Sequence, residues 1–200
     1  SAASDVYKRQ FQKLIKNNYL NNNVNQKNLI FVFNICNFLK INLKKIIPTL
    51  NKFKGLRFRN EIVINGKKIK VINDSKSTSF SSTQELIDTK KKTFWILGGL
   101  PKKGDKFTLS KKDCFNLRAY IFGKNAEFFA KRLKDKVHYQ KFNNMISAIK
   151  KIKIDFKKEQ MSNEKIILFS PSASFDDFKN FEDRGKYFNY QLKKIGINGK

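Results

Sequence analysis

Cysteine and histidine are scarce in this 200-residue sequence, which has two of the first and one of the second. Cys36 and Cys114 stand far apart and form no metal-ligand motif, so we expect neither a zinc site nor a disulfide, but two small buried apolar side chains. The lone His138 lies beside an expected strand, which favours a surface or packing role. No apolar run approaches the ~18 residues of a membrane-spanning helix, and a reducing cytoplasm fits the free thiols.

Acidic residues are also few, because 16 Asp and Glu stand against 43 Lys and Arg, for a net charge of +27. Such an excess is typical of proteins that bind nucleic acid or an anionic membrane. Here, however, the lysines are spread along almost the whole chain, among the Asn, Ile and Phe residues that AT-rich codons favour. No Cys/His finger, aromatic RNA-binding motif or heptad repeat accompanies them. The charge therefore predicts salt-sensitive, nonspecific contact with polyanions, and a noncatalytic basic nucleic-acid-binding domain stays open as an alternative.

What the sequence does contain is enough apolar material for a folded core. The hydrophobic fraction is 40% and there are 20 Phe residues, which indicates a globular chain rather than a disordered one. A length of 200 residues fits one domain of ordinary size with additional chain.

The stretch that organises the chain is Val71-Ile72-Asn73-Asp74-Ser75-Lys76-Ser77-Thr78. A short β-branched apolar run ends in a polar cluster, which predicts a strand that leads into a loop and a helix start. Open α/β sheets bind ligands at the carboxyl ends of their strands, so these polar groups are candidates for a binding site. The alternative is a solvated loop in which Ser or Thr caps the helix.

A second stretch, 166–185, repeats this design: a buried strand, then Ser170-Pro171-Ser172-Ala173-Ser174, then a helix. The two motifs in this order and separation resemble the Mur ligases, the amide-forming enzymes of peptidoglycan synthesis. The resemblance covers residues 15 to 196 and is nearest to the branch that adds D-glutamate to UDP-N-acetylmuramoyl-L-alanine. Another amino-acid ligase of the family is the alternative, although Ser174-Phe175 and Lys179-Asn180-Phe181 argue against it.

Apolar periodicity predicts strands that alternate with helices, and hence an α/β fold with a Rossmann-like, mostly parallel sheet and flanking helices. A hairpin around Asn65-Gly66, with positive φ at both residues, should precede it. Parallel strands then place 74–78, 98–103 and 170–175 along one edge of the sheet. We expect strands at 61–64, 68–72, 93–97, 116–122, 137–139 and 166–169, and helices at 11–19, 29–39, 43–53, 82–91, 125–133, 141–152 and 181–195.

The resemblance also implies a domain organisation. We expect residues 1–10 to be a non-native leader, 11–57 to be the last helices of a truncated central ATP-binding domain, and 58–200 to be the C-terminal D-glutamate-binding domain. No G-x-x-x-x-G-K-[ST] phosphate loop occurs in the sequence. The 200 residues are therefore expected to be inactive alone, and to act as a monomeric part of an ATP-dependent ligase.

The reaction that the resemblance implies begins when ATP phosphorylates the alanyl carboxylate of UDP-N-acetylmuramoyl-L-alanine. The amine of D-glutamate then attacks the acyl phosphate, with Mg²⁺ held mainly by residues outside this chain. Cations and hydroxyl donors are needed to position two carboxylates and to offset the developing negative charge.

By the same resemblance, individual residues receive roles. Capping is the alternative for Asn25, Asn28, Thr78 and Ser174, and a solvated surface charge is the alternative for Arg59 and Lys102. Val24 and Phe58 stand where the family has histidine, so no histidine role is carried over. Lys76 is implied to be catalytic. The residues implied to bind D-glutamate are Thr78, Lys102, Ser174, Phe175 and Phe181. The residues implied to bind the nucleotide are Asn25, Asn28, Arg59 and Asp74.

Overall fold

The computed structural model describes residues 14–17, 19–21, 23–159, 164–175 and 177–199. The chain divides into two compact units, Ser1–Gly55 and Leu56–Lys200, called here the small unit and the sheet unit. The proposed leader, residues 1–10, lies outside the described residues.

In the small unit, two helices enclose a minor core. They are α2 (Asn23–Phe38) and α3 (Leu43–Lys52), and α3 begins where the Asn42 side chain accepts the N–H of Lys44 at 3.0 Å. The buried apolar side chains of this unit are Ile15, Leu20, Leu29, Phe33 and Cys36.

The predicted helix at 11–19 is wrong for its described residues, which form turns and irregular chain. The side chain of Asn17 donates to the carbonyls of Leu50 and Phe53, at 2.8 and 2.6 Å, and accepts the N–H of Tyr19 at 2.9 Å. Such bonds from a side chain to the backbone compete with the helical ladder.

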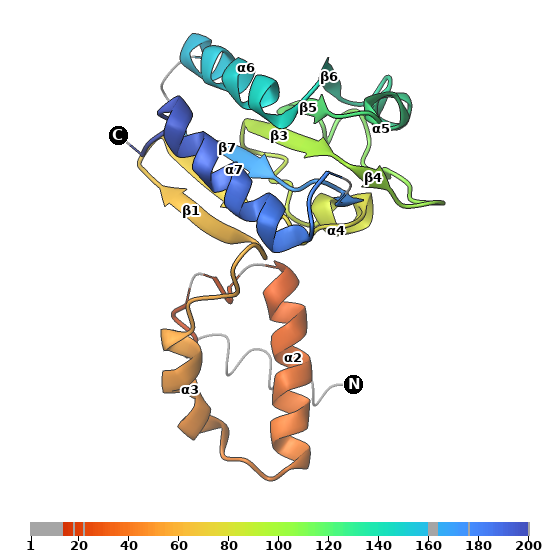
Figure 1. Ribbon diagram of the computed structural model, residues 1–200. Helices are drawn as coiled ribbons and strands as arrows, with labels where there is room; N and C mark the ends of the chain where they lie inside the picture. Colours follow the sequence, from red (N-terminus) through yellow and green to blue (C-terminus); the bar gives the residue numbers. More distant parts are fainter. Residues whose placement is uncertain (1–13, 18, 22, 160–163, 176, 200) are drawn as a thin grey trace. The chain divides into compact units, whose positions relative to one another are not determined.

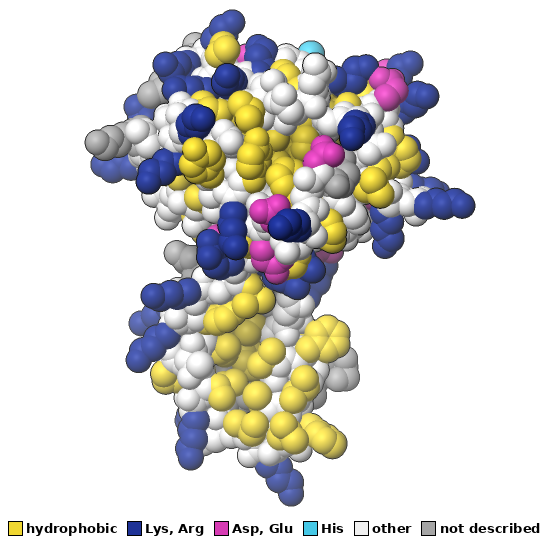
Figure 2. Space-filling model, in the orientation of Figure 1, with side chains coloured by type: hydrophobic (Ala, Val, Ile, Leu, Met, Phe, Trp, Pro, Cys, Tyr) yellow, Lys and Arg dark blue, Asp and Glu magenta, His cyan; other side chains and the backbone are white. Residues whose placement is uncertain are grey.

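The apolar residues of the helix predicted at 29–39 fall on more than one face, which is typical of a well-buried helix, but one face of α2 is exposed. Phe31, Ile35 and Phe38 of α2 are 69%, 58% and 85% exposed. Figure 2 shows apolar side chains gathered over this unit. A helix with one neighbouring helix can bury only one stripe, here the stripe of Leu29 and Phe33.

The sheet unit is built on a six-stranded sheet of order β1-β2-β7-β3-β5-β6, in which β1 is antiparallel to β2 and the other pairs are parallel. The α/β class and the mostly parallel sheet are therefore confirmed. The strands are β1 (Glu61–Asn65), β2 (Ile69–Asn73), β3 (Thr93–Gly98), β5 (Leu117–Phe122), β6 (His138–Phe142) and β7 (Lys165–Phe169), and a separate ribbon joins β4 (Leu100–Pro101) to β8 (Ala173–Ser174).

Helices cover both faces of this sheet (Figure 1). One face packs against α6 (Met145–Lys158) and α7 (Phe181–Ile195), and the other packs against α4 (Phe80–Gln84) and α5 (Ala126–Leu133). Both faces are apolar, which explains why β3 and β7 are buried along their whole length.

Several boundaries differ from the sequence prediction, among them the start of α2, at Asn23 rather than 29, and the end of β6, at Phe142 rather than 139. The turn after β1 spans 66–68, and neither Asn65 nor Gly66 has positive φ. A glycine is needed at this position for another reason, which is that the backbone of Gly199 lies against it. A Cβ at Gly66 would overlap the carbonyl oxygen of Gly199. The helix predicted at 82–91 ends at Gln84, and the helix predicted at 141–152 starts at Met145, after the Asn144 cap.

The predicted meeting of three loops at the carboxyl edge of the sheet is confirmed. The N–H of Asp74, after β2, donates to the carbonyl of Phe169 at 2.7 Å, and the N–H of Gly98 donates to the carbonyl of Pro171 at 3.2 Å. The loops after β2, β3 and β7 are thus joined by backbone bonds, and the candidate site is built on them.

Candidate functional site

Two glycines let the loop after β3 approach the loop after β7. Gly98 and Gly99 have φ of +152° and +127°, conformations that side chains disfavour. A Cβ at Gly98 would overlap the carbonyl oxygen of Phe122, and a Cβ at Gly99 would lie 2.5 Å from that of Ser174. The pair therefore permits the β4–β8 ribbon, which lies next to the candidate residue Lys102.

Asp74 is the buried acid of the site, with 8% of its surface exposed. Its carboxylate accepts the N–H of Asn60 at 3.0 Å and the hydroxyl of Ser170 at 3.1 Å. Burial raises the pKa of Asp74 to about 6, although these two hydrogen bonds and the charges of Arg59 and Arg184 oppose the rise. This carboxyl can therefore change its charge near neutral pH.

A chain of buried hydroxyls continues from Asp74. The hydroxyl of Thr83 lies 2.7 Å from those of Ser170 and Ser172, and 2.8 Å from that of Ser77. The network fixes the loop after β7 against α4 and the loop after β2. Since hydroxyls both donate and accept, each member can be satisfied in more than one pattern.

Arg184 of α7 ties the same loops from the other side, and it is 1% exposed. Its guanidinium donates to the carbonyls of Ser75, Ala173 and Ser174 at 2.7, 3.0 and 3.1 Å, and to the hydroxyl of Ser75 at 3.2 Å. One planar group thus holds two loops in register. The sequence prediction missed Arg184. The available signal was that Arg184 stands four residues before Phe188, which places a charged residue on the buried face of the helix.

Asn73 was among the polar groups expected at the strand end, without a role of its own, and it anchors α7 to the end of β2. Its side chain accepts the N–H of Ser75 at 3.0 Å and donates to the carbonyl of Gly185 and to the side chain of Asn189, at 3.0 and 2.8 Å. A buried amide at a strand end, in a stretch already singled out, was the available signal.

Lys76 and Phe181, both expected at the site, lie together. The ammonium of Lys76 is 4.0 Å from the centroid of the Phe181 ring, and the hydroxyl of Ser75 donates to the carbonyl of Phe181 at 2.8 Å. The backbone N–H of Lys76 donates to the carbonyl of Phe58 at 3.0 Å. The start of α7 and the loop after β2 therefore form one surface that carries a positive charge.

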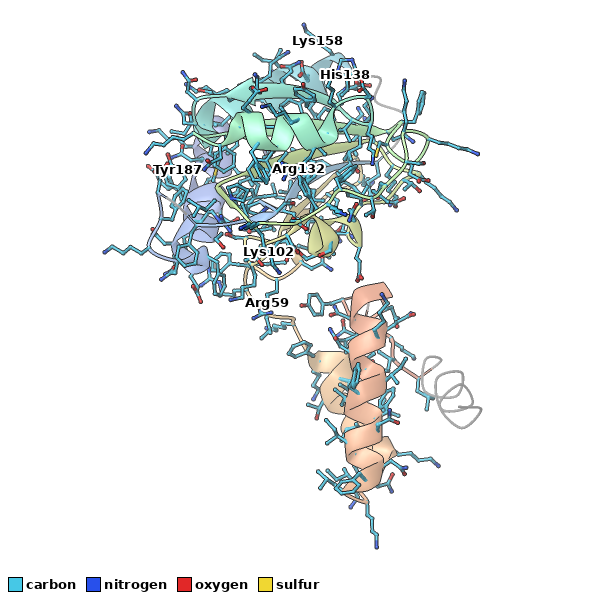
Figure 3. The ribbon with its side chains drawn as sticks, turned by 90° about the vertical axis from the view of Figure 1, so that its right-hand side faces the viewer. Arg59, Lys102, Arg132, His138, Lys158 and Tyr187 are labelled. Atoms are coloured by element: carbon cyan, nitrogen blue, oxygen red, sulfur yellow. The ribbon has the colours of Figure 1, made fainter. Side chains whose placement is uncertain are left out.

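The other residues implied to bind D-glutamate are solvent-accessible. Thr78, Lys102 and Ser174 are exposed, and Phe175 is 43% exposed. Ser174 pairs with Leu100 in the β4–β8 ribbon, which places it near the turn that carries Lys102. Figure 3 shows Lys102 and Arg59 toward one end of the sheet unit and Lys158 toward the opposite end.

The four residues implied to bind the nucleotide are divided between the units. Arg59 and Asp74 lie in the sheet unit, whereas Asn25 and Asn28 lie on α2 of the small unit. Asn25 donates to the carbonyl of Tyr19 at 2.7 Å, and Asn28 is exposed.

Among the described residues, no group of three or more His, Cys, Asp or Glu side chains could hold a metal ion. Cys36 and Cys114 are free and buried, as expected. In the same part of the chain, no helix is long and apolar enough to cross a membrane.

No protein-family model matches the chain. Two curated UDP-N-acetylmuramoylalanine–D-glutamate ligases, from Wolbachia sp. subsp. Brugia malayi and Francisella philomiragia subsp. philomiragia, are each 34% identical to it, over 173 and 176 residues. The matches cover 86% of this chain in both cases. The chain is homologous to Mur ligases. It spans 34% and 41% of the length of these two relatives.

A solved Mur ligase supports the fold. The crystal structure of MurF ligase from Thermotoga maritima in complex with ADP matches with a TM-score of 0.52 at 16% identity, over 85% of this chain and 39% of that one. The likeness confirms the α/β architecture that the Mur-ligase resemblance predicted.

Proposed function

We propose that this chain supplies the C-terminal, amino-acid-binding part of an ATP-dependent amide ligase. The ligase adds D-glutamate to UDP-N-acetylmuramoyl-L-alanine through an acyl phosphate, in peptidoglycan synthesis. In this proposal residues 11–57 end the central ATP-binding domain and residues 58–200 form the D-glutamate domain. The homology to enzymes of that name supports the choice of substrates.

The observation that carries the proposal is the edge of the sheet, where the loops after β2, β3 and β7 are bonded to one another. Exposed hydroxyls and ammonium groups at this edge surround a rigid base of Asp74, Thr83 and Arg184. An amino acid with two carboxylates needs such donors on a fixed support.

D-Glutamate would be held by groups of distinct chemistry. Lys102 is an exposed ammonium that can pair with one carboxylate as a compact charge. The hydroxyls of Thr78 and Ser174 can donate to the carboxylates, while the rings of Phe175 and Phe181 form the apolar side of the site. The Arg184 bond to the carbonyl of Ser174 positions that residue.

Lys76 would act nearest the reacting atoms, where its ammonium offsets the negative charge that develops as the amide forms. Its stacking on Phe181 fixes the direction of the side chain. ATP would activate the substrate carboxylate by phosphorylation, and Arg59, Asp74, Asn25 and Asn28 are the residues proposed to contact it. Mg²⁺ would be held mainly by residues outside these 200, and among the described residues no group of three or more His, Cys, Asp or Glu side chains could hold a metal ion.

The binding test uses Trp95, the single tryptophan of the sequence. Its buried indole N–H donates to the carbonyl of Ser170 at 2.8 Å, so its one NMR signal reports on the loop that carries Ser174 and Phe175. D-Glutamate should shift this signal in a saturable way, and L-glutamate or meso-diaminopimelate should not. A shift only with another amino acid would favour a different amide ligase, and no shift with any would contradict the proposed site.

Two neighbouring lysines provide a matched pair of variants for the same titration. Lys102→Met should weaken D-glutamate binding about tenfold or more, because a charged hydrogen bond is lost. Lys103→Met, an equal change at the next exposed residue, should change it less than twofold. A ligation assay on the 200 residues alone should show no turnover, and robust turnover would contradict the fragment proposal.

A further inference from the structure

A cavity of about 250 Å³ lies on the face of the sheet that packs against α6 and α7. Its walls come from α6, from the chain just after α7, and from β2 and β7. Ile69, the first residue of β2, lines it, whereas the candidate site begins after Asn73 at the other end of that strand. Four residues of strand separate these ends by roughly 13 Å, so the cavity is distinct from the candidate site.

The floor of the cavity is apolar. Ile69, Ile167 and Ile197 are 4%, 0% and 9% exposed, and the half-buried ring of Phe156 completes the lining. The volume is just below the range of about 300–1,000 Å³ of pockets that hold drug-sized ligands. The space therefore suits a short apolar group rather than a large cofactor.

The rim of the cavity is cationic. Lys153 and Lys157 both line it and lie on the same side of α6, because they are four residues apart. The Lys153 ammonium donates to the carbonyl of Ile195, the last residue of α7, which leaves it two further donors. The amide of Asn198 adds a neutral polar group.

No carboxylate lines this cavity among the described residues. Within that same part of the chain neither Lys153 nor Lys157 forms an ion pair. The nearby Glu159, which follows α6, is already paired with Arg118 at 2.9 Å and with Lys92 at 3.5 Å. The rim therefore offers positive charge that no ion pair among the described residues neutralises.

We propose that this cavity binds a small amphipathic carboxylate. The apolar tail lies on Ile69, Ile167 and Ile197, and the carboxylate meets the ammonium groups of Lys153 and Lys157. An apolar floor beneath a rim of one sign excludes cations, and it favours an anion with a tail over a bare anion.

The test titrates the ¹⁵N-labelled chain with acetate, butyrate and hexanoate at physiological salt. Amide signals of Ile69, Ile167 and residues 196–198 should shift, and affinity should rise about fourfold for each added methylene that is buried. Hexanol should bind about tenfold or more weakly than hexanoate, since it lacks the charge. Equal affinity for the three acids would overturn the proposal, because a surface attraction to lysines does not depend on tail length.

Variants on α6 separate the site from the general positive charge. Lys157→Glu reverses a rim charge and should weaken hexanoate about tenfold or more, whereas Lys158→Glu makes the same change at the next exposed residue, outside the cavity, and should have less than a twofold effect. Equal weakening by both variants, or the absence of saturable shifts at the lining amides, would show that the cavity is not a binding site.

Discussion

At the scale of single residues, Asp74 carries the largest electrostatic cost at the candidate site. Its carboxylate is buried, and the hydrogen bonds from Asn60 and Ser170 do not fully replace water. A carboxyl whose pKa is raised in the folded state keeps its proton there at a pH where the unfolded chain has lost it. Asp74 therefore lowers the free energy of unfolding as pH rises, which is opposite to the usual behaviour of a paired carboxylate.

The prediction concerns the window between the ordinary pKa of 3.8 and the raised value of about 6. Asp74→Asn keeps the shape and stays neutral, so it should lose the decline in stability across this window. Above pH 7 the variant should be more stable than the wild type by up to about 3 kcal/mol, and near pH 4 the two should be similar. Urea unfolding at several pH values measures the difference.

The control is Asp113, whose pKa is lowered by hydrogen bonds from Ser110. Asp113→Asn should have the opposite sign, because a carboxylate with a lowered pKa stabilises the fold above its unfolded pKa and loses that effect as pH falls. Parallel stability curves for Asp74→Asn and the wild type would contradict the burial cost assigned to Asp74.

Residues of the candidate site could be foreseen from sequence only where they stand in a motif. Lys76 and Phe181 were expected at one site, and the structure brings them into contact. Arg184 and Thr83 were not foreseen, since their roles depend on which loops lie beside them in space. A motif identifies groups that leave a strand end, but not the buried groups that hold those loops in place.

At the scale of elements, α7 is positioned by a glycine. Gly185 faces Phe58, whose ring is 2% exposed, and a Cβ at Gly185 would overlap that ring. Elsewhere on a helix, Gly→Ala stabilises by about 1 kcal/mol. Here the overpacking should exceed this gain, so Gly185→Ala should lower the free energy of unfolding by about 1–3 kcal/mol.

A double-mutant cycle tests the cause. In a Phe58→Ala background the ring is gone, so adding Gly185→Ala should be neutral or stabilising by urea unfolding. An equal cost in both backgrounds would show that the ring contact does not decide the effect. A circular-dichroism spectrum of each variant checks that α7 is still formed.

The same scale shows where periodicity predicts elements well. The bounds of α7 were predicted as observed, because a long amphipathic pattern starts at the Asn180 cap and ends at Gly196. The helix predicted at 82–91 is observed at Phe80–Gln84, and the described residues of the segment 11–19, which was predicted as a helix, do not form one. In the second segment, side-chain hydrogen bonds between Asn17 and the backbone compete with the pattern.

At the scale of the whole molecule, the two units differ in how completely they bury their apolar residues. The sheet unit encloses two apolar clusters, whereas α2 of the small unit leaves Phe31, Ile35 and Phe38 exposed. This contrast could not be predicted from α2 alone, because an apolar helix sequence does not say how many neighbours it has.

The net charge of +27 belongs to this scale as well. If the charge is diffuse, the chain should bind duplex DNA and heparin without sequence preference. With about 6–10 phosphates contacted, its DNA affinity should fall roughly 10³–10⁵-fold between 50 and 200 mM salt. Lys90→Glu, Lys134→Glu and Lys193→Glu, three exposed positions far apart in the sequence, should each reduce binding by a similar small factor. One dominant position, or selective binding that survives 200 mM salt, would instead support a dedicated nucleic-acid site, because only a localised groove concentrates the effect of single charges.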